Sequence, residues 1–232
     1  QISLYPKGKC IGYAAKIMEE KLKKLGLKVL ISKKNNITNY QENLMVSCDT
    51  EDVSADFIFI TTELDDALNL FKEKVTTKNN NHYVSQVLYY FATNKIYSKY
   101  QYIHGNDVDI YTNRATNFSL YGEKTKNNEN VISSEVPTKI GSELWNNPEK
   151  FKDTIWKELE NMGMVKKNQK YSDCKIFNIE KTLSIPLINF DNTLKEFHKL
   201  INSNYSNKIF LPGVGTFTRN IFMESLNSIF KK

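Results

Sequence analysis

A stretch near the C-terminal end has the sequence pattern that is best suited to binding an anion. Residues 209–211 form a short apolar run suited to a buried strand, and Pro212, Gly213 and Gly215 then break the chain. After this turn, apolar residues recur at helical spacing. A strand, a glycine turn and a helix start together aim free backbone N–H groups at a phosphate. The alternative is a strand-to-helix corner that binds no ligand.

The same stretch is not a complete dinucleotide-binding fingerprint. Gly213, Gly215 and Thr218 fall one residue short of that pattern, which also needs a further βαβ unit and an acidic residue about 20 positions later. The sequence reaches Lys232 before either could occur. We therefore expect this stretch to be the closing strand and helix of a fold.

Length and composition predict a globular protein with a full core. The chain has 232 residues, of which 40% are hydrophobic and 25% are charged. No apolar run is long enough to span a membrane, and the first residues lack the features of a signal peptide. We expect a cytoplasmic protein, and because Gln1 is not a start methionine, we expect an internal fragment or a processed chain.

The charge pattern argues against nucleic acid as the partner. The net charge of +6 comes from lysines scattered among asparagines. A nucleic-acid site needs that charge on one face, with aromatic side chains in a groove. A generic basic binding domain stays open as an interpretation, and its affinity would fall steeply with salt.

Residue types that carry metal or nucleophilic chemistry are sparse. The three cysteines form no CxxC pair, which fits a reducing compartment, and the three histidines have no metal-ligand spacing. No Gly-x-Ser-x-Gly elbow is present, so a hydrolase triad has no anchor. We predict no metal site, and no side chain stands out as a catalytic acid, base or nucleophile.

Apolar periodicity predicts alternating helices and strands at the start of the chain. We expect a helix from Ile11 that ends at Gly26, which serves as its C-cap. The strands expected next are Leu27–Ile31, Leu44–Cys48 and Asp56–Thr61, with a polar loop over residues 32–43 between the first two.

The middle of the chain has longer β runs. The expected strands there are Tyr83–Thr93, Gln101–His104, Phe118–Tyr121, Asn130–Val136 and Cys174–Ile179. Helices are expected from about Pro148 to Met162 and from Asp191 to Ile201.

These elements predict an α/β (α+β) fold. We expect residues 1–78 and 205–232 to share one layered unit, with Ile60 and Phe210 in adjoining strands. A β-rich insertion, residues 79–204, would supply a substrate platform, because ligand pockets favour domain interfaces.

Several short motifs, taken in their order along the chain, resemble a known family. They are Tyr5-Pro6-Lys7-Gly8, Ala55–Thr62, Tyr102-Ile103-His104, Arg114–Ser119, Ser134-Glu135-Val136, Glu143-Leu144-Trp145, Glu158-Leu159, Met162-Gly163-Met164 and Gly213–Leu226. The order resembles the later part of a FAD-dependent amine-oxidase-type flavoprotein. It is most similar to the UDP-galactopyranose mutase-like branch found with bacterial surface-polysaccharide enzymes.

The resemblance implies FAD as cofactor and a nucleotide sugar as the small-molecule substrate. The cofactor-binding residues that it implies are Gly8, Gly12, Gly213, Gly215, Arg219 and Asn220. The substrate-binding residues that it implies are Arg114, Asn117, Tyr102 and Tyr111. A guanidinium fork suits bidentate phosphate binding, and we expect Arg114 to face the turn that begins at Gly213. The alternative for Arg114 is a solvated surface arginine.

Three departures from the family pattern leave two hypotheses open. Nothing before Tyr5 can supply the opening strand and glycine-rich phosphate loop, Val214 replaces a residue that is usually polar, and Ile185 precedes Pro186 where relatives often have tyrosine. The resemblance thus implies that this chain alone does not hold FAD. It is either the later portion of a FAD-dependent oxidoreductase or mutase-like protein of surface-glycan metabolism, or a flavin-less binding or scaffold protein.

Overall fold

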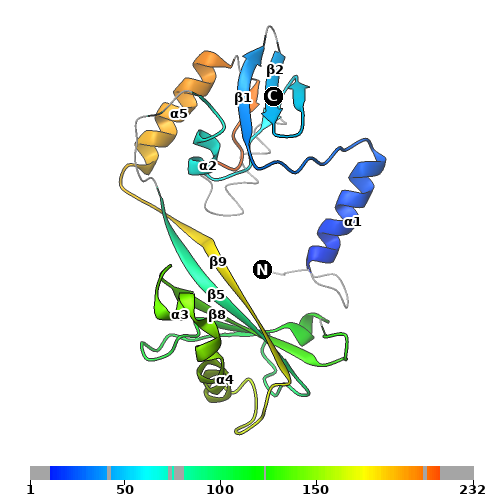
Figure 1. The fold of residues 1–232 in the computed structure, drawn as a ribbon, viewed down its shortest axis with the longest axis vertical. Helices are drawn as coiled ribbons and strands as arrows, with labels where there is room; N and C mark the ends of the chain where they lie inside the picture. The colour runs from blue at the N-terminus through cyan, green and yellow to red at the C-terminus, as the bar shows by residue number, and fades with distance from the viewer. Residues whose placement is uncertain are drawn as a thin grey trace. The chain divides into compact units, whose positions relative to one another are not determined.

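The computed structural model describes residues 11–40, 43–72, 75, 81–122, 124–205 and 208–214 (Figure 1). Helices and strands mix along the chain, which confirms the predicted α/β class. Two compact units divide the chain and are described separately here: Gln1–Lys28 with Tyr83–Leu183, and Val29–His82 with Ser184–Lys232. The division expected from the sequence, in which residues 1–78 and 205–232 form one cofactor-binding-type unit, stays a prediction.

The first unit is built on a five-stranded sheet of order β6-β7-β8-β5-β9. Its strands are β5 (Asn81–Thr93), β6 (Tyr102–His104), β7 (Arg114–Asn117), β8 (Asn130–Thr138) and β9 (Asp173–Pro186). Neighbouring strands run antiparallel, and hydrogen bonds from Ser172 to Ala92 and from Thr182 to Val84 join the two ends of the β5–β9 pair.

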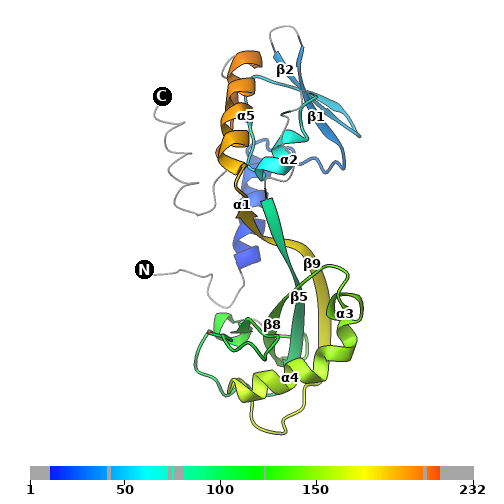
Figure 2. The same ribbon diagram turned by 90° about the vertical axis from the view of Figure 1, so that its left-hand side faces the viewer.

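Helices cover one face of this sheet, which we call the covered face (Figure 2). They are α3 (Glu143–Asn146), the 3-10 helix η2 (Pro148–Phe151) and α4 (Lys152–Asn161). Ser142 caps α3 by accepting from the Trp145 amide, and Gly163, with φ of 75°, follows the end of α4. The core between the two layers consists of Val87, Tyr89, Phe91, Ala115, Ile132, Val136, Leu144, Ile155, Trp156, Leu159, Met164 and Val165.

The second unit contains two small sheets and two helices. Its elements are β1 (Asn35–Tyr40), β2 (Asn43–Cys48), β3 (Asp52–Ala55), β4 (Ile58–Phe59), α2 (Leu64–Leu68), α5 (Phe190–Asn204) and β10 (Ile209–Phe210). Strands β1, β2 and β3 form an antiparallel sheet, whereas β4 and β10 pair in parallel. In its core, the ring of Phe71 packs edge-on against Phe197 and Tyr205.

The parallel pair confirms that the segments of Ile60 and Phe210 lie in adjoining strands. Ile209 lies opposite Ile58, and the Ile60 amide donates to the Phe210 carbonyl over 2.8 Å. Ile60 is buried, as expected, while Phe210 is half-buried. The strand that we expected over residues 56–61 is shorter than predicted, since β4 covers two residues only.

Helix α1 (Ile11–Lys24) ends as the sequence predicts. The Gly26 amide bonds to Lys23, the Leu27 amide reaches back to Leu22, and Gly26 has a φ of 98° that glycine adopts without strain. The side chains of Met18 and Leu22 on this helix are exposed.

Two predictions that follow α1 are wrong. Residues 27–31 form no strand, and Ile31 is 89% exposed, whereas the expected polar loop contains β1. The asparagine-rich β1 is a strand because β2 offers it a full antiparallel ladder from Asn35 to Tyr40. A pairing partner can override weak local propensity in either direction.

The expected strand at residues 118–121 is also wrong, because this segment is the 3-10 helix η1 (Phe118–Tyr121). The Asn117 side chain accepts a hydrogen bond from the Ser119 amide over 3.1 Å, and Gly122 closes the turn with a φ of 85°. Such a side-chain cap competes with the strand ladder for the backbone donor.

Candidate functional site

The face of the five-stranded sheet turned away from α3 and α4, here the open face, carries two rows of side chains. Directly paired residues of an antiparallel sheet project on the same side. One row therefore runs across four strands through His104, Arg114, Glu135 and Leu88. The second row consists of Tyr102, Thr116, Ser133 and Tyr90. Cationic, acidic and aromatic groups thus converge on one surface.

Arg114 and Glu135 form an ion pair at the centre of the first row. The Nε and Nη2 atoms of Arg114 donate to the same carboxylate oxygen, over 2.8 and 2.5 Å. The Arg114 side chain is 44% exposed and the Glu135 side chain 19%. A guanidinium has further N–H donors, so Nη1 can still bind an anionic ligand while Glu135 fixes the orientation of the fork.

The pairing of β7 with β8 is irregular at Arg114, by one residue. Glu135 is in register with Arg114, yet its carbonyl also accepts from the Asn113 amide over 2.9 Å. Asn113, just before β7, and Arg114 thus both oppose Glu135, which is the arrangement of a β-bulge. Bulges re-aim side chains and occur frequently beside functional sites.

Tyr102 and His104 add aromatic groups next to Arg114. Their rings meet edge to face with centroids 5.4 Å apart, and His104 lies directly opposite Arg114 in the ladder. Both side chains are exposed. A ring system and a cation side by side suit a ligand that carries both a flat group and a negative charge.

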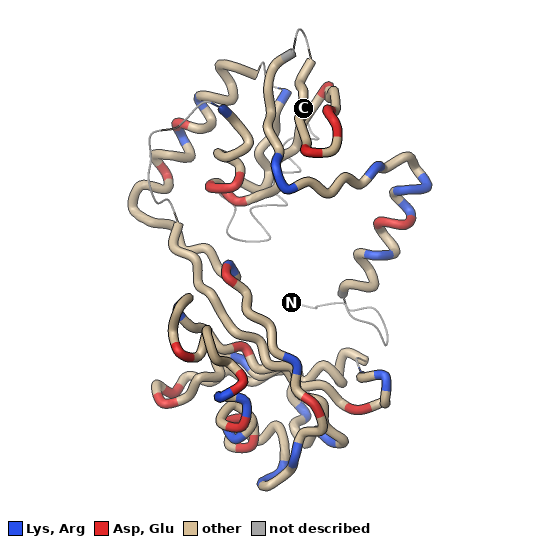
Figure 3. Tube along the Cα trace, in the orientation of Figure 1, with Lys and Arg blue, Asp and Glu red and all other residues tan. Residues whose placement is uncertain are grey.

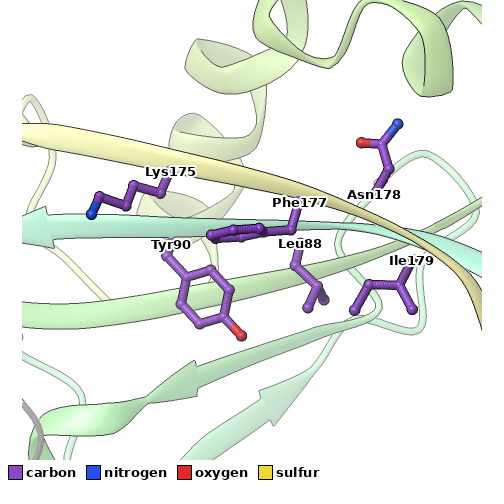
Figure 4. A pocket seen from close by; sticks show the side chains of 6 residues that line it. All are labelled: Leu88, Tyr90, Lys175, Phe177, Asn178 and Ile179. Carbon is purple, nitrogen blue, oxygen red and sulfur yellow. The ribbon is translucent and has the colours of Figure 1, made fainter. Parts of the chain in front are cut away.

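An open pocket of about 580 Å³ lies on β5 and β9 (Figure 4). Its lining residues are Leu88, Tyr90, Lys175, Phe177, Asn178 and Ile179. The Tyr90 and Phe177 rings meet edge-on at 5.9 Å. Burial, and then the negative charge of Glu135, raise the pKa of Tyr90, so its hydroxyl keeps its proton at neutral pH.

A buried carboxylate behind the sheet holds the loop that leads into β7. Glu158 of α4 accepts from the amides of Tyr111 and Thr112 over 2.8 and 2.9 Å, and from the Thr112 hydroxyl over 2.6 Å. The Thr112 hydroxyl also bonds to Ser134 over 2.8 Å. This network, buried at Thr112, Ser134 and Glu158, holds the chain two residues before Arg114.

Glu158 was not among the candidate site residues from the sequence. It lies on the apolar side of α4, between Ile155 and Leu159, and a carboxylate on a core-facing helix stripe is a signal that indicates a buried hydrogen-bonding role. Gly105 supports the same loop, because a Cβ there would lie 2.2 Å from the Thr112 carbonyl oxygen.

Of the four predicted substrate residues, Tyr102 and Arg114 lie together on the open face. Asn117 is buried on the covered face, where its amide donates to Ser98 over 3.3 Å. The ring of Tyr111 packs edge-on against Phe151 of η2, 5.6 Å away. The structure therefore does not bring Asn117 and Tyr111 to the surface that carries Arg114, and their substrate roles stay predictions.

Among the predicted cofactor residues, Gly12 and Gly213 are described. Gly12 is an exposed position of α1. A Cβ at Gly213 would lie 2.4 Å from backbone atoms of Thr61, so the close approach of the chain itself accounts for this glycine. Gly8, Gly215, Arg219 and Asn220 lie outside the described residues. Gly12 and Gly213 by themselves therefore form no cradle for FAD.

No metal cluster and no membrane-spanning helix occur in the part of the chain that the structure describes. Three or more His, Cys, Asp or Glu side chains nowhere come together there to hold a metal ion. No helix in those residues is long and apolar enough to cross a membrane. Basic and acidic residues are scattered along both units (Figure 3).

Comparisons with known proteins agree with the fold. The sequence matches no protein-family model and no curated protein. A putative protoporphyrinogen oxidase from Exiguobacterium sp. 255-15 is similar with a TM-score of 0.64 and 9% identity, over 93% of this chain and 50% of that one. A reduced UDP-galactopyranose mutase gives 0.59 and 15%, over 80% and 42%. A fatty acid isomerase from P. acnes that produces CLA gives 0.54 and 8%, over 85% and 47%.

These likenesses establish a shared fold. The chain spans about half the length of the three solved structures that it matches. One of them is a UDP-galactopyranose mutase, the branch that the motif order resembles. The broad resemblance to this group of folds is therefore supported, while the particular branch belongs to the proposals below.

Proposed function

We propose that this chain is the later, substrate-binding portion of a FAD-dependent oxidoreductase or mutase-like protein that acts on a nucleotide sugar in surface-glycan metabolism. The observation that carries the proposal is the open face, where Arg114, oriented by Glu135, lies beside Tyr102 and His104. The fold shared with a UDP-galactopyranose mutase supports the same interpretation.

In this proposal Arg114 binds the diphosphate of the substrate. Because its Nε donates to Glu135, the donors on Nη1 are the ones available to bind the ligand. Tyr102 stacks on a ring of the substrate from the neighbouring strand. Glu158 keeps the loop before Arg114 in place and does not itself touch the ligand.

FAD would supply the redox or covalent chemistry in the whole protein, and this chain's residues bind and orient the substrate. The test is a visible absorption spectrum of the full-length protein, followed by titration with a uridine diphosphate sugar. Flavin bands, together with binding that Arg114→Ala weakens, are the expected result. A folded, colourless protein that binds no such sugar would overturn the proposal.

A flavin-less binding or scaffold protein is the second candidate, and two observations favour it. Val214 is buried in the core of its unit, where the family pattern has a polar residue. The backbone of Thr61 occupies the space that a side chain at Gly213 would need. Sugar binding by a colourless protein would support this candidate over the first.

A further inference from the structure

The pocket on β5 and β9 is lined mainly by apolar side chains on the open face of the sheet. Leu88 and Tyr90 project from β5, and Phe177 and Ile179 from β9, while Phe177 is 52% exposed. Contiguous exposed apolar side chains mark binding sites more often than single ones do. The volume of about 580 Å³ lies within the range of small-ligand sites.

Aromatic rings shape the inside of this pocket. Phe177 stands edge-on to Tyr90, with the ring planes at 80°, and the Phe118 ring also packs against Tyr90, with the centroids 5.9 Å apart. The Tyr90 ring is therefore fixed, and the Phe177 ring stays accessible. Such a pair offers one face and one edge to a third ring, which is the geometry that aromatic ligands prefer.

The polar groups of the lining are hydrogen-bond donors or point elsewhere. Lys175 makes no ion pair within the described residues, and Figure 4 shows it at the opposite end of the pocket from Ile179. The Tyr90 hydroxyl can donate, and the Asn178 amide is turned to the covered side, where it bonds to the Trp145 carbonyl over 2.8 Å. These donors favour a ligand that presents acceptors or negative charge.

The charges around the pocket determine at which end the negatively charged group of a ligand binds. Leu88 lies directly opposite Glu135, so one edge of the pocket adjoins a carboxylate that is already paired with Arg114, whereas Lys175 is itself a lining residue. The ammonium of Lys175 attracts the negatively charged group. We infer that this pocket binds an aromatic carboxylate, with its rings against Phe177, Leu88 and Ile179 and its carboxylate at Lys175.

The inference does not depend on the proposed function, because binding is measured without flavin and without a nucleotide sugar. Naphthoate is the probe, and naphthamide, which has the same rings but no charge, is its matched control. Calorimetric titration of the 232-residue chain should show that naphthoate binds more tightly than naphthamide. Equal affinity for the two probes, or no binding of naphthoate, would overturn the inference.

Two variants locate the binding. Lys175→Met keeps the apolar stem, and it should weaken naphthoate by about tenfold or more and leave naphthamide unchanged, as expected for loss of a charged hydrogen bond. Phe177→Ala should weaken both probes. Lys181→Met, on the same strand but outside the pocket lining, is the control and should change neither.

The alternative outcomes are equally definite. If Lys175→Met and Lys181→Met weaken naphthoate equally, the effect is one of net charge and the pocket assignment is wrong. If Phe177→Ala leaves both affinities unchanged while its circular dichroism matches the parent, the rings bind elsewhere.

Discussion

The two faces of the five-stranded sheet differ in how their side chains are used. On β5 the residues Val87, Tyr89 and Phe91 have no exposed surface, whereas their neighbours Leu88 and Tyr90 line an open pocket. Because side chains alternate along a strand, a single sequence supplies packing on one face and recognition on the other. Substitutions on the two faces should therefore change different properties.

Polar groups show the same contrast. On the covered face the Tyr89 hydroxyl donates to the Pro148 carbonyl over 2.8 Å, and the Tyr111 amide and both donors of Thr112 bond to Glu158. On the open face the fork of Arg114 is oriented by one carboxylate oxygen and half exposed. Buried polar groups need their partners, whereas exposed donors can wait for a ligand.

The largest effect is expected from removing a ring on the covered face. Phe91→Ala should lower the free energy of unfolding by about 3–5 kcal/mol, because it leaves a cavity against Trp156 and Tyr171. Phe177→Ala, an exposed ring on the open face, should stay within about 0.5 kcal/mol. Urea denaturation measures both. Similar losses for the two variants would break the distinction between the faces.

Removing the buried carboxylate should have the next largest effect. Glu158→Ala leaves the Tyr111 and Thr112 amides unpaired, which costs about 1–3 kcal/mol for each buried group. Glu158→Gln keeps an acceptor oxygen and should lose less. The control is Glu149→Ala, an exposed carboxylate that pairs with Lys152. A Glu158→Ala protein as stable as this control would contradict the assigned network.

Arg114→Ala should affect binding more than folding. Under the proposed function it should weaken a diphosphate-containing ligand by about 1.5–3 kcal/mol, the range for a hydrogen bond to a charged group. Stability should change by less than about 1 kcal/mol, since the Arg114 side chain of this ion pair is 44% exposed. Arg114→Lys keeps the charge without the fork and should restore only part of the affinity. Unchanged binding with a large stability loss would make Arg114 purely structural.

The smallest effect concerns the titration of the two β5 tyrosines. Burial raises the pKa of both Tyr89 and Tyr90, and Glu135 contributes to the shift at Tyr90. Glu135→Gln should therefore lower the pKa of Tyr90 and leave that of Tyr89 unchanged, as followed by ultraviolet absorbance of tyrosinate. Tyr90→Phe identifies the transition.

The sign of the stability effect follows from the raised pKa. The folded state favours the neutral phenol, so the contribution of Tyr90 is complete below the unfolded value of about 10 and is lost as the pH rises through the folded pKa. Unfolding free energies measured across that range should fall less steeply in Tyr90→Phe than in the parent. An identical slope would contradict the burial of this hydroxyl.

The sequence by itself determined the elements whose signal is local. The alternation from Tyr83 to Thr93, the amphipathic stretch from Pro148 to Met162 and the glycine after α1 each predict an element that the structure contains. Of the candidate site, Arg114 and Tyr102 were identified from residue type and motif order. These features depend on the period of the side chains and on backbone conformations that neighbouring residues impose.

Only the tertiary structure decided which strands exist where the local signal is weak. The asparagine-rich β1 is held by its ladder with β2, while the apolar residues 27–31 have no strand partner within the described chain. The tertiary structure also determined which side chains form the candidate site. Glu135 pairs with Arg114, and Phe177 packs against Tyr90, between strands that are distant in sequence. Register and cross-strand partners arise from long-range pairing, which no local period encodes.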